Sequence, residues 1–261
     1  MFHDIVVPLD GSSLAECAIG PAGWIATECR ARLHLVRVHV RRDAATAQDA
    51  VARAADARYV HELAGWLREG SHHETVDVVL DGSPALAIAD YADRVTADLV
   101  VMTTHGRSGI ERRQFGSVAG VVAHHVACPV ILARGEPGEY VPRQVPLERI
   151  VLALDGTERP EDVQILALRL GRLGHPSFRI VRTLTPALVS QPAYAGAMEE
   201  RGEREVVAAA ESYLSGIVAR LRAAGMRAEI LVTVTDDSPR AILEVAERDE
   251  ADAVVVLGQR G

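Results

Sequence analysis

Two short segments of this 261-residue sequence carry the residue types from which a ligand site could be built. Asp10-Gly11-Ser12 follows an apolar run, and the carboxylate of Asp10 can accept hydrogen bonds from hydroxyl or amino groups. The segment from Gly106 to Gly116-Ser117 follows a later apolar run, and its glycines allow backbone amides to approach an anion. A helix that begins at Ser117 would add unpaired N–H groups. The two segments together predict an anion cradle opposite an acidic side chain.

The same residues also fit purely structural roles. Asp at the end of a strand is commonly a turn residue or a helix cap, and Gly116-Ser117 is a plausible helix cap with or without a ligand. His105 is interpreted as a loop histidine, because no carboxylate or nucleophile is fixed beside it by the sequence. No catalytic residue and no metal site are therefore predicted.

The elements that would position these residues occur twice along the chain. DIVVPLDGS at residues 4–12 recurs as RIVLALDGT at residues 149–157, and the later segments DGSPALAI and ADLVVM recur in the same order as DDSPRAIL and ADAVVV. We interpret this as a tandem duplication. We expect a first domain over residues 1–135, a linker rich in Pro and Gly over 136–147, and a second domain over 148–261 that lacks the C-terminal helix and strand of the first.

Each half alternates short, continuous apolar runs with longer stretches of helical periodicity. Strands are predicted over residues 4–9, 33–40, 75–80, 98–103 and 129–133, with long helices over 43–69 and 193–224. Ser13-x-x-Glu16 fits a capping box, and Ser238-Pro239 fits an N-cap followed by proline. The pattern is typical of an α/β protein with two tandem, doubly wound parallel sheets of Rossmann-like type. Ligands of such sheets lie at the carboxyl ends of the strands.

Composition excludes several kinds of function. All 28 basic residues are arginine, the net charge is −8, and the sequence has neither lysine nor asparagine. A P-loop lysine and a Schiff base are therefore excluded, and binding to nucleic acid is not expected. The first turn lacks the G-x-G-x-x-G of dinucleotide-binding sites. Without a basic leader or a long apolar stretch, we expect a cytoplasmic protein that does not bind membranes.

At these residues the sequence resembles a tandem member of the universal stress protein family. The family pattern is an aspartate that closes the first strand, followed after the fourth strand by G-x2-G-x9-G-[ST]. Asp10 matches the aspartate, and Gly106 matches the second glycine of the motif. After nine intervening residues, Gly116-Ser117 complete it, while Thr103 stands where the first glycine would be. The resemblance implies an adenine nucleotide α-hydrolase-like fold for both halves.

The resemblance also implies a ligand. ATP or another adenine nucleotide is expected, with Mg2+ as a candidate companion ion, and the implied contacts come from both halves. These residues are Asp10, Val40, Gly106, Arg107, Gly116, Ser117 and Val118 in the first half, and Asp155, Gly258 and Gly261 in the second. Val40 would cover the base, and the glycine loop with Ser117 would hold the phosphates. Arg107 could add a charge-assisted phosphate contact.

The resemblance favours a stress-response sensor or regulator, with slow ATP hydrolysis at most. Two other hypotheses remain open. One is an interaction protein without nucleotide, which Thr103 supports because its β-branch resists the conformations open to glycine. The other is an adenylating or thiolating enzyme that uses ATP, which Asp10-Gly11-Ser12-Ser13 supports only weakly. Pairing of the two halves and a homodimer are expected, with residues 129–133 as the candidate interface.

Overall fold

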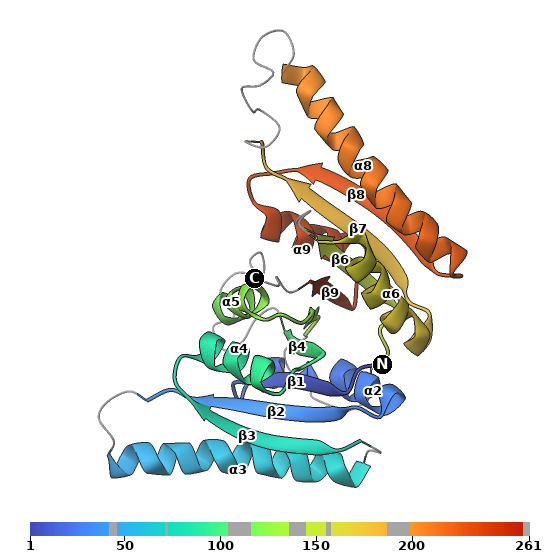
Figure 1. Ribbon diagram of the computed structural model, residues 1–261. Helices are drawn as coiled ribbons and strands as arrows, with labels where there is room; N and C mark the ends of the chain where they lie inside the picture. Colours follow the sequence, from blue (N-terminus) through green and yellow to red (C-terminus); the bar gives the residue numbers. More distant parts are fainter. Residues whose placement is uncertain are drawn as a thin grey trace. The chain divides into compact units, whose positions relative to one another are not determined.

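The computed structural model describes residues 1–41, 46–70, 73–103, 116–135, 145–154, 158–186 and 199–257. The chain divides into two compact units, Met1–Pro146 and Leu147–Leu257. Each unit contains a parallel β-sheet with helices packed on its faces, and the labels used below are those of Figure 1.

The sheet of the first unit has the strand order β3-β2-β1-β4-β5, and all of its pairings are parallel. Its strands are β1 (Asp4–Leu9), β2 (Arg32–His39), β3 (Thr75–Asp81), β4 (Leu99–Thr103) and β5 (Val130–Ala133). Strands β1, β4 and β5 are almost completely buried, because helices cover both of their faces. Each strand lies within two residues of its predicted range at both ends.

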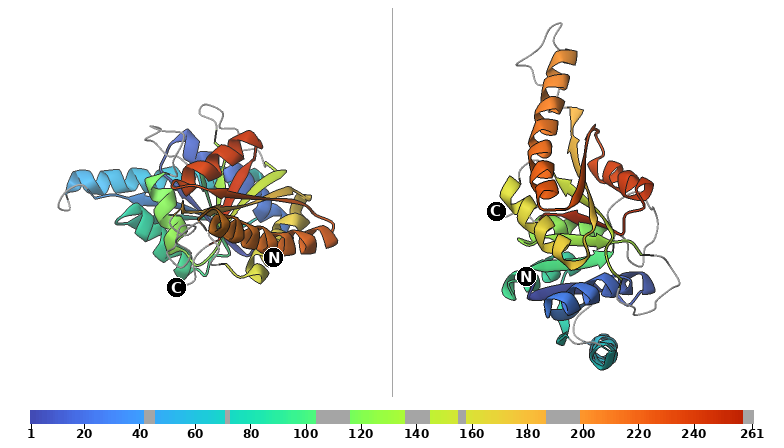
Figure 2. Two further views of the ribbon diagram at one scale, coloured as in Figure 1. Left: turned by 90° about the horizontal axis from the view of Figure 1, so that it is seen from above. Right: turned by 90° about the vertical axis from the view of Figure 1, so that its right-hand side faces the viewer.

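Within the described residues of the first unit, five helices accompany the sheet. They are α1 (Ser13–Glu16), α2 (Ile19–Cys29), α3 (Ala47–Gly70), α4 (Pro84–Arg94) and α5 (Ser117–His125). The long helix α3 connects β2 to β3 and packs against both strands, and Figure 2 shows it nearly end-on in the right-hand view. It buries Val60, Ala64 and Leu67, which are spaced by four and three residues and so form one stripe.

The second unit repeats this plan. Its strands β6 (Arg149–Leu154), β7 (Ser177–Leu184), β8 (Arg227–Val234) and β9 (Ala253–Val256) lie in the order β8-β7-β6-β9, again in parallel. Helices α6 (Pro160–Gly174), α8 (Glu199–Ala223) and α9 (Ser238–Arg248) pack on them. Within α8, a stripe of buried apolar residues at helical spacing faces the sheet, comprising Ala210, Leu214, Ile217, Val218 and Leu221.

One structural detail occurs at equivalent places in both units. The carboxylate of Asp98 accepts hydrogen bonds from the backbone N–H groups of His3 and Asp4, at 2.8 and 3.4 Å. In the second unit, Asp252 accepts from the N–H groups of Glu148 and Arg149, both at 2.8 Å. The predicted duplication therefore extends from strand order to single hydrogen bonds.

Two predicted helix starts are wrong by one residue. Ser12, not Ser13, is the N-cap of α1, and its side chain accepts from the N–H of Ala15 at 3.1 Å. Glu16 is consequently not part of a capping box and instead accepts a hydrogen bond from Tyr59 at 2.6 Å. Asp237 caps α9 in place of Ser238, since its carboxylate accepts from the N–H of Arg240.

Two further observations concern membrane-spanning helices and the state of the cysteines. Among the described helices, none is both long enough and apolar enough to span a membrane. The three cysteines are free thiols, with Cys29 and Cys128 buried and Cys17 half-buried.

Candidate functional site

The candidate site of the first unit lies where the strand order reverses. Strand β1 pairs with β2 on one side and with β4 on the other, so the carboxyl end of β1 lies between the ends of these two strands. Helical connections leave such a reversal point in opposite directions, and a crevice for ligands forms there. Asp10 is the first residue after β1 and therefore occupies this point.

The carboxylate of Asp10 organises its own turn. Its Oδ1 accepts hydrogen bonds from the backbone N–H of Ser12 at 2.9 Å and from the Ser12 hydroxyl at 2.5 Å. Gly11 adopts a φ of 75°, which a residue with a side chain rarely takes. Asp10 thus stabilises the turn after β1, which is the structural role expected for an aspartate at the end of a strand. The same hydrogen bonds fix the direction of its carboxylate.

Val40 follows the neighbouring strand β2 and is unusual within its surroundings. Its side chain is 53% exposed, whereas the apolar side chains of β2 are buried. An exposed apolar side chain at a strand end of this kind can cover the flat face of a ligand. Val40 and Asp10 therefore follow adjacent strands at the same edge of the sheet.

Helix α5 supplies the predicted anion-binding turn. Gly116 is its N-cap and has no side chain that could accept the first N–H groups of the helix. Ser117 is the first helical residue and is exposed, and Val118 follows it half-buried. These N–H groups and the helix dipole favour a negatively charged ligand at this end.

Thr103, the last residue of β4, is 5% exposed. A Cβ atom added to Gly135 would lie 3.4 Å from the Thr103 methyl group and 2.6 Å from Cδ1 of Leu14. The chain after β5 therefore passes close to Thr103, and a side chain at position 135 would make the Leu14 side chain move. Thr103, which stands in place of a motif glycine, thus lies next to the segment that follows β5.

Five of the predicted contacts lie outside the described residues. These are Gly106, Arg107, Asp155, Gly258 and Gly261. His105 also lies outside them. Asp10 and Val40 are placed on neighbouring strand ends, and Gly116, Ser117 and Val118 form the start of α5, but the segment that joins β4 to α5 is not among the described residues.

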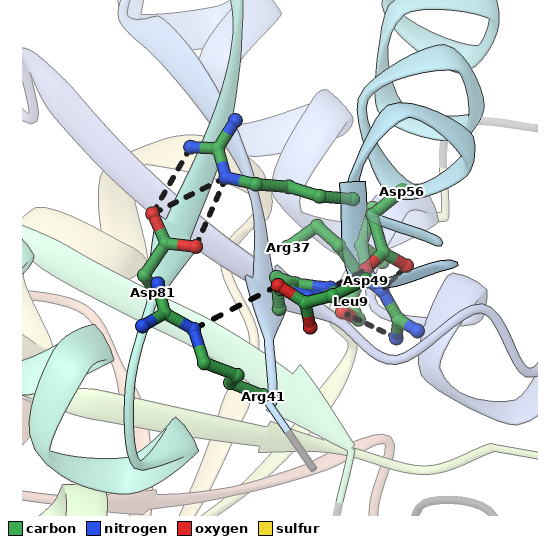
Figure 3. Close-up of polar contacts among 8 residues, drawn as sticks. Leu9, Arg37, Arg41, Asp49, Asp56 and Asp81 are labelled. Atoms are coloured by element: carbon green, nitrogen blue, oxygen red, sulfur yellow. Dashed lines mark hydrogen bonds and ion pairs between the residues drawn. The ribbon is translucent and has the colours of Figure 1, made fainter. Parts of the chain in front are cut away.

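Beside this site lies a group of charged residues that the sequence analysis did not single out. We call Arg37, His39, Arg41, Asp49 and Asp56 the β2–α3 ionic cluster, and Figure 3 shows its contacts. Nδ1 of His39 lies 2.8 Å from Asp56 Oδ2, and Nε2 lies 3.1 Å from Asp49 Oδ1. Arg37 donates to Asp56 at 2.8 Å and to the carbonyl oxygen of Leu9 at 3.4 Å. The cluster thereby ties the ends of β1 and β2 to α3.

The electrostatics of this cluster favour a doubly protonated His39. Hydrogen bonds to Asp56 and then to Asp49 raise the pKa of His39 above 6.5, although the ring is only 4% exposed. Burial alone would raise the pKa of Asp56, but the hydrogen bonds from Arg37 and His39 outweigh it and lower that pKa. Both ring nitrogens of the imidazolium donate, so each meets a carboxylate.

A second ion pair holds the adjacent strand to the same helix. Arg53 of α3 donates to both carboxylate oxygens of Asp81, through Nε at 2.9 Å and through a terminal nitrogen at 3.0 Å. Arg41 extends the β2–α3 ionic cluster by a 3.7 Å contact with Asp49 (Figure 3). The strand ends around Val40 are therefore fixed by several charged contacts to α3.

A signal for the cluster exists in the sequence. Arg37 and His39 are two apart in an otherwise apolar strand, so they share one face of it, and Asp49 and Asp56 are seven apart on a helix. Polar residues at alternate positions on a buried strand require partners from the helix that covers them. The partners could be identified only once the covering helix was known.

Comparisons with known proteins agree with this architecture. A model of the universal stress protein family matches residues 1–134. A universal stress protein of Mycobacterium tuberculosis is 31% identical over 136 residues, which is 50% of this chain and 45% of that protein. One from Methanocaldococcus jannaschii is 43% identical over 56 residues, which is 22% of this chain and 33% of that protein. The chain thus spans less than half the length of these curated relatives.

Solved structures match nearly the full length. The crystal structure of a universal stress protein from Archaeoglobus fulgidus has a TM-score of 0.63 and 12% identity, covering 98% of this chain and 96% of that one. A putative universal stress protein from Pseudomonas aeruginosa has a TM-score of 0.60 and 15% identity, with coverage of 98% and 93%. At these identities the likeness concerns the fold, with its two α/β halves. Because the family model covers just over half of the chain, this protein belongs to the universal stress protein family.

Proposed function

We propose that this protein binds an adenine nucleotide at the carboxyl ends of β1, β2 and β4, and that it acts as a sensor or regulator in a stress response. The observation that carries the proposal is the position of Asp10 at the reversal of strand order, with the exposed Val40 at the adjacent strand end. An acidic acceptor beside an exposed apolar side chain suits a nucleoside, which has hydroxyl groups and a flat, weakly polar base.

Each part of the nucleotide has a matching group. The Asp10 carboxylate accepts from ribose hydroxyls or the adenine amino group, and Val40 covers the base. The phosphates meet the N–H groups that start α5 at Gly116, Ser117 and Val118. Gly106 and Arg107 would complete the phosphate side, and Mg2+ would accompany ATP there. Asp155, Gly258 and Gly261 are the corresponding proposed contacts of the second unit.

The rigid surroundings of Val40 support the proposal. The β2–α3 ionic cluster fixes the end of β2, and Arg37 binds the carbonyl oxygen of Leu9, the residue before Asp10. A site whose side chains are held before the ligand arrives loses less conformational entropy on binding. We propose regulation rather than efficient catalysis, because the chain has no lysine that could neutralise a transferring phosphoryl group.

A second candidate function has one specific observation in its favour. Thr103 packs beside Gly135 and Leu14, at the strand end that neighbours Asp10. If this packing occupies the space that the phosphates need, the protein works without nucleotide, as an interaction protein that pairs through its folded surfaces. Replacing Thr103 by glycine would then create nucleotide binding in a protein that otherwise has none.

Calorimetry with nucleotide-free, full-length protein tests the proposal. ATP should bind, and Ser117→Asp should abolish that binding, since a carboxylate at the helix start repels phosphate yet is favourable for the helix itself. Asp162→Ala is a control distant in sequence, because it removes a half-buried carboxylate of α6 that pairs with Arg159, the N-cap of that helix. Binding by Thr103→Gly alone would favour the second candidate. If neither the wild type nor Thr103→Gly binds ATP, the nucleotide proposal is overturned.

A further inference from the structure

The second unit contains a cavity at the edge of its sheet opposite to the strand ends discussed above. Its volume is about 650 Å3, within the usual range for small-molecule sites. It lies at the amino ends of β6, β7 and β8, and four arginines contribute to its lining, namely Arg149, Arg179, Arg222 and Arg227. Only two carboxylates, those of Glu229 and Asp249, line it with them.

The internal duplication shows what stands at this place in the first unit. In the first sheet, Asp4 is level with Arg32, and Glu74 precedes Thr75, which is level with Leu33. In the second sheet, Arg149 is level with Ser177, and Ser177 is level with Arg227. The residues Asp4, Arg32 and Glu74 therefore correspond one by one to Arg149, Ser177 and Arg227.

The charges of these two rows are opposite. In the first unit, the Arg32 guanidinium lies between two carboxylates, with Nε 3.5 Å from Asp4 and 3.6 Å from Glu74. In the second unit, both outer positions carry arginine, and the central arginine is replaced by serine. The row changes from a cation between two anions to a small hydroxyl side chain between two cations.

This replacement leaves the two outer arginines without a central partner of opposite charge. Arg149 forms a 3.4 Å ion pair with Glu250, and the two side chains are 49% and 71% exposed. For Arg227, no ion pair occurs within the described part of the chain. An exposed pair of this kind is worth little, so the Arg149 guanidinium can turn toward a better partner at small cost.

Of the other two arginines of the cavity, Arg179 is paired with carboxylates and Arg222 donates to a backbone carbonyl oxygen. Arg179 lies 2.6 Å from Glu229 and 2.7 Å from Asp249, and Nε of Arg222 donates to the carbonyl oxygen of Ala228 at 3.0 Å. Burial alone would raise the pKa of Asp249, but the hydrogen bonds from Arg179 and Arg248 lower it, so this carboxylate stays charged. A carbonyl oxygen does not neutralise a guanidinium, so Arg222 adds to the positive charge of the cavity, while Arg149 and Arg227 are the two arginines that flank Ser177.

We propose that the second unit binds a phosphate group, free or as the monoester of a small organic molecule, between Arg149 and Arg227 above Ser177. Strands are spaced by about 4.8 Å, so the two arginines begin roughly 10 Å apart and can reach inward to a group between them. A phosphate carries up to two negative charges and offers oxygens to both guanidinium forks, which one carboxylate cannot do as well. The bound anion would occupy the position that corresponds to the Arg32 guanidinium of the first unit. An anion would then lie between two cations, where the first unit has a cation between two anions.

The test uses the full-length protein and inorganic phosphate at constant ionic strength, with binding followed by calorimetry. Arg227→Gln and Arg149→Gln should each weaken binding by about tenfold or more, because each removes a charge-assisted contact. Ser177→Glu should abolish it, because a carboxylate between the two arginines repels phosphate and pairs with their guanidinium groups. Arg240→Gln is the matched control, since it removes an exposed arginine that pairs with Glu244 on α9.

Glycerol 3-phosphate distinguishes the two sources of the phosphate group. Tighter binding of the ester than of inorganic phosphate assigns the site to a phosphorylated metabolite, and equal binding assigns it to free phosphate. The proposal is overturned if neither probe binds, or if Arg149→Gln and Arg227→Gln bind as tightly as Arg240→Gln. Because Arg227 is exposed, its substitution leaves the fold intact and the result can be interpreted even if Ser177→Glu does not fold. Ser117→Asp should leave this binding unchanged, which separates it from the proposed nucleotide site.

Discussion

Nδ1 of His39 lies 2.8 Å from the carboxylate of Asp56, while Nε2 of the same ring lies 3.1 Å from Asp49, so one imidazole joins β2 to two successive places on α3. The contact couples the stability of the first unit to the protonation of a single ring. His39 also immediately precedes Val40 in the sequence. Its contacts therefore fix the strand end that carries Val40 in the proposed nucleotide site.

The first prediction concerns pH. The pKa of His39 is raised in the folded protein, mainly by Asp56, so the ring contributes stability fully below the unfolded pKa of about 6.5 and loses it as pH rises through the folded value. Each unit by which the pKa is raised corresponds to about 1.4 kcal/mol. Urea unfolding between about pH 6 and pH 9 should show wild type losing more stability than His39→Gln. Parallel curves for the two proteins would show that His39 is not coupled to folding.

The second prediction concerns Asp56. Its removal leaves Arg37 and His39 as neighbouring cations without their shared carboxylate, and the side chains of Arg37 and Asp56 are only 16% and 17% exposed. Asp56→Ala should therefore destabilise the protein by about 2–4 kcal/mol. Asp162→Ala, which removes a half-buried carboxylate whose partner Arg159 is 68% exposed, should cost at most about 1 kcal/mol. A similar loss for both variants, measured by chemical denaturation, would rule out a special role for the cluster.

The third prediction follows from the duplicated contacts of Asp98 and Asp252. Each carboxylate accepts hydrogen bonds from two backbone N–H groups at the start of a sheet, and alanine replaces these charge-assisted bonds by bonds to water. Asp98→Ala and Asp252→Ala should each destabilise folding by about 1–3 kcal/mol. Hydrogen exchange can locate each effect, because the loss should be confined to the unit that carries the substitution. Exchange that increases equally in both units would contradict the assignment of one contact to each.

The fourth prediction concerns the thiols. Burial raises the pKa of Cys128 to about 12, so this residue is almost wholly protonated at neutral pH. Cys29 is also buried, whereas Cys17 is half-buried. Iodoacetamide should therefore modify Cys17 first in the native protein, and all three cysteines after denaturation. Peptide mass spectrometry that finds Cys128 modified at the native rate of Cys17 would refute this.

Much of the fold could be predicted because its signals are local. Continuous apolar runs gave the strand positions of the first half, and the repeated segments gave the second half the same order of elements. The errors at α1 and α9 arose where adjacent residues had equal capping ability, as with Ser12 and Ser13, since the backbone geometry decides which one caps the helix.

Less of the candidate site could be predicted from the sequence. Asp10 and Ser117 stand at positions where loops meet elements, so their backbone context could be inferred. The partners of His39 could not, because Asp49 and Asp56 contact it only through the register of α3 on β2. The reversed charges of Arg149, Ser177 and Arg227 likewise became visible only after the strands of the two sheets were aligned.

The most direct test of the central claim is calorimetric titration of ATP into full-length protein freed of endogenous nucleotide. We predict measurable binding in wild type and in Arg227→Gln, binding weakened about tenfold or more in Asp10→Ala, and none in Ser117→Asp. Asp10→Ala weakens binding because a carboxylate acceptor is lost. Ser117→Asp abolishes it because the new carboxylate repels phosphate at the start of α5. Absence of binding in wild type, or equal affinity in all four proteins, would contradict a nucleotide site at the carboxyl ends of β1, β2 and β4.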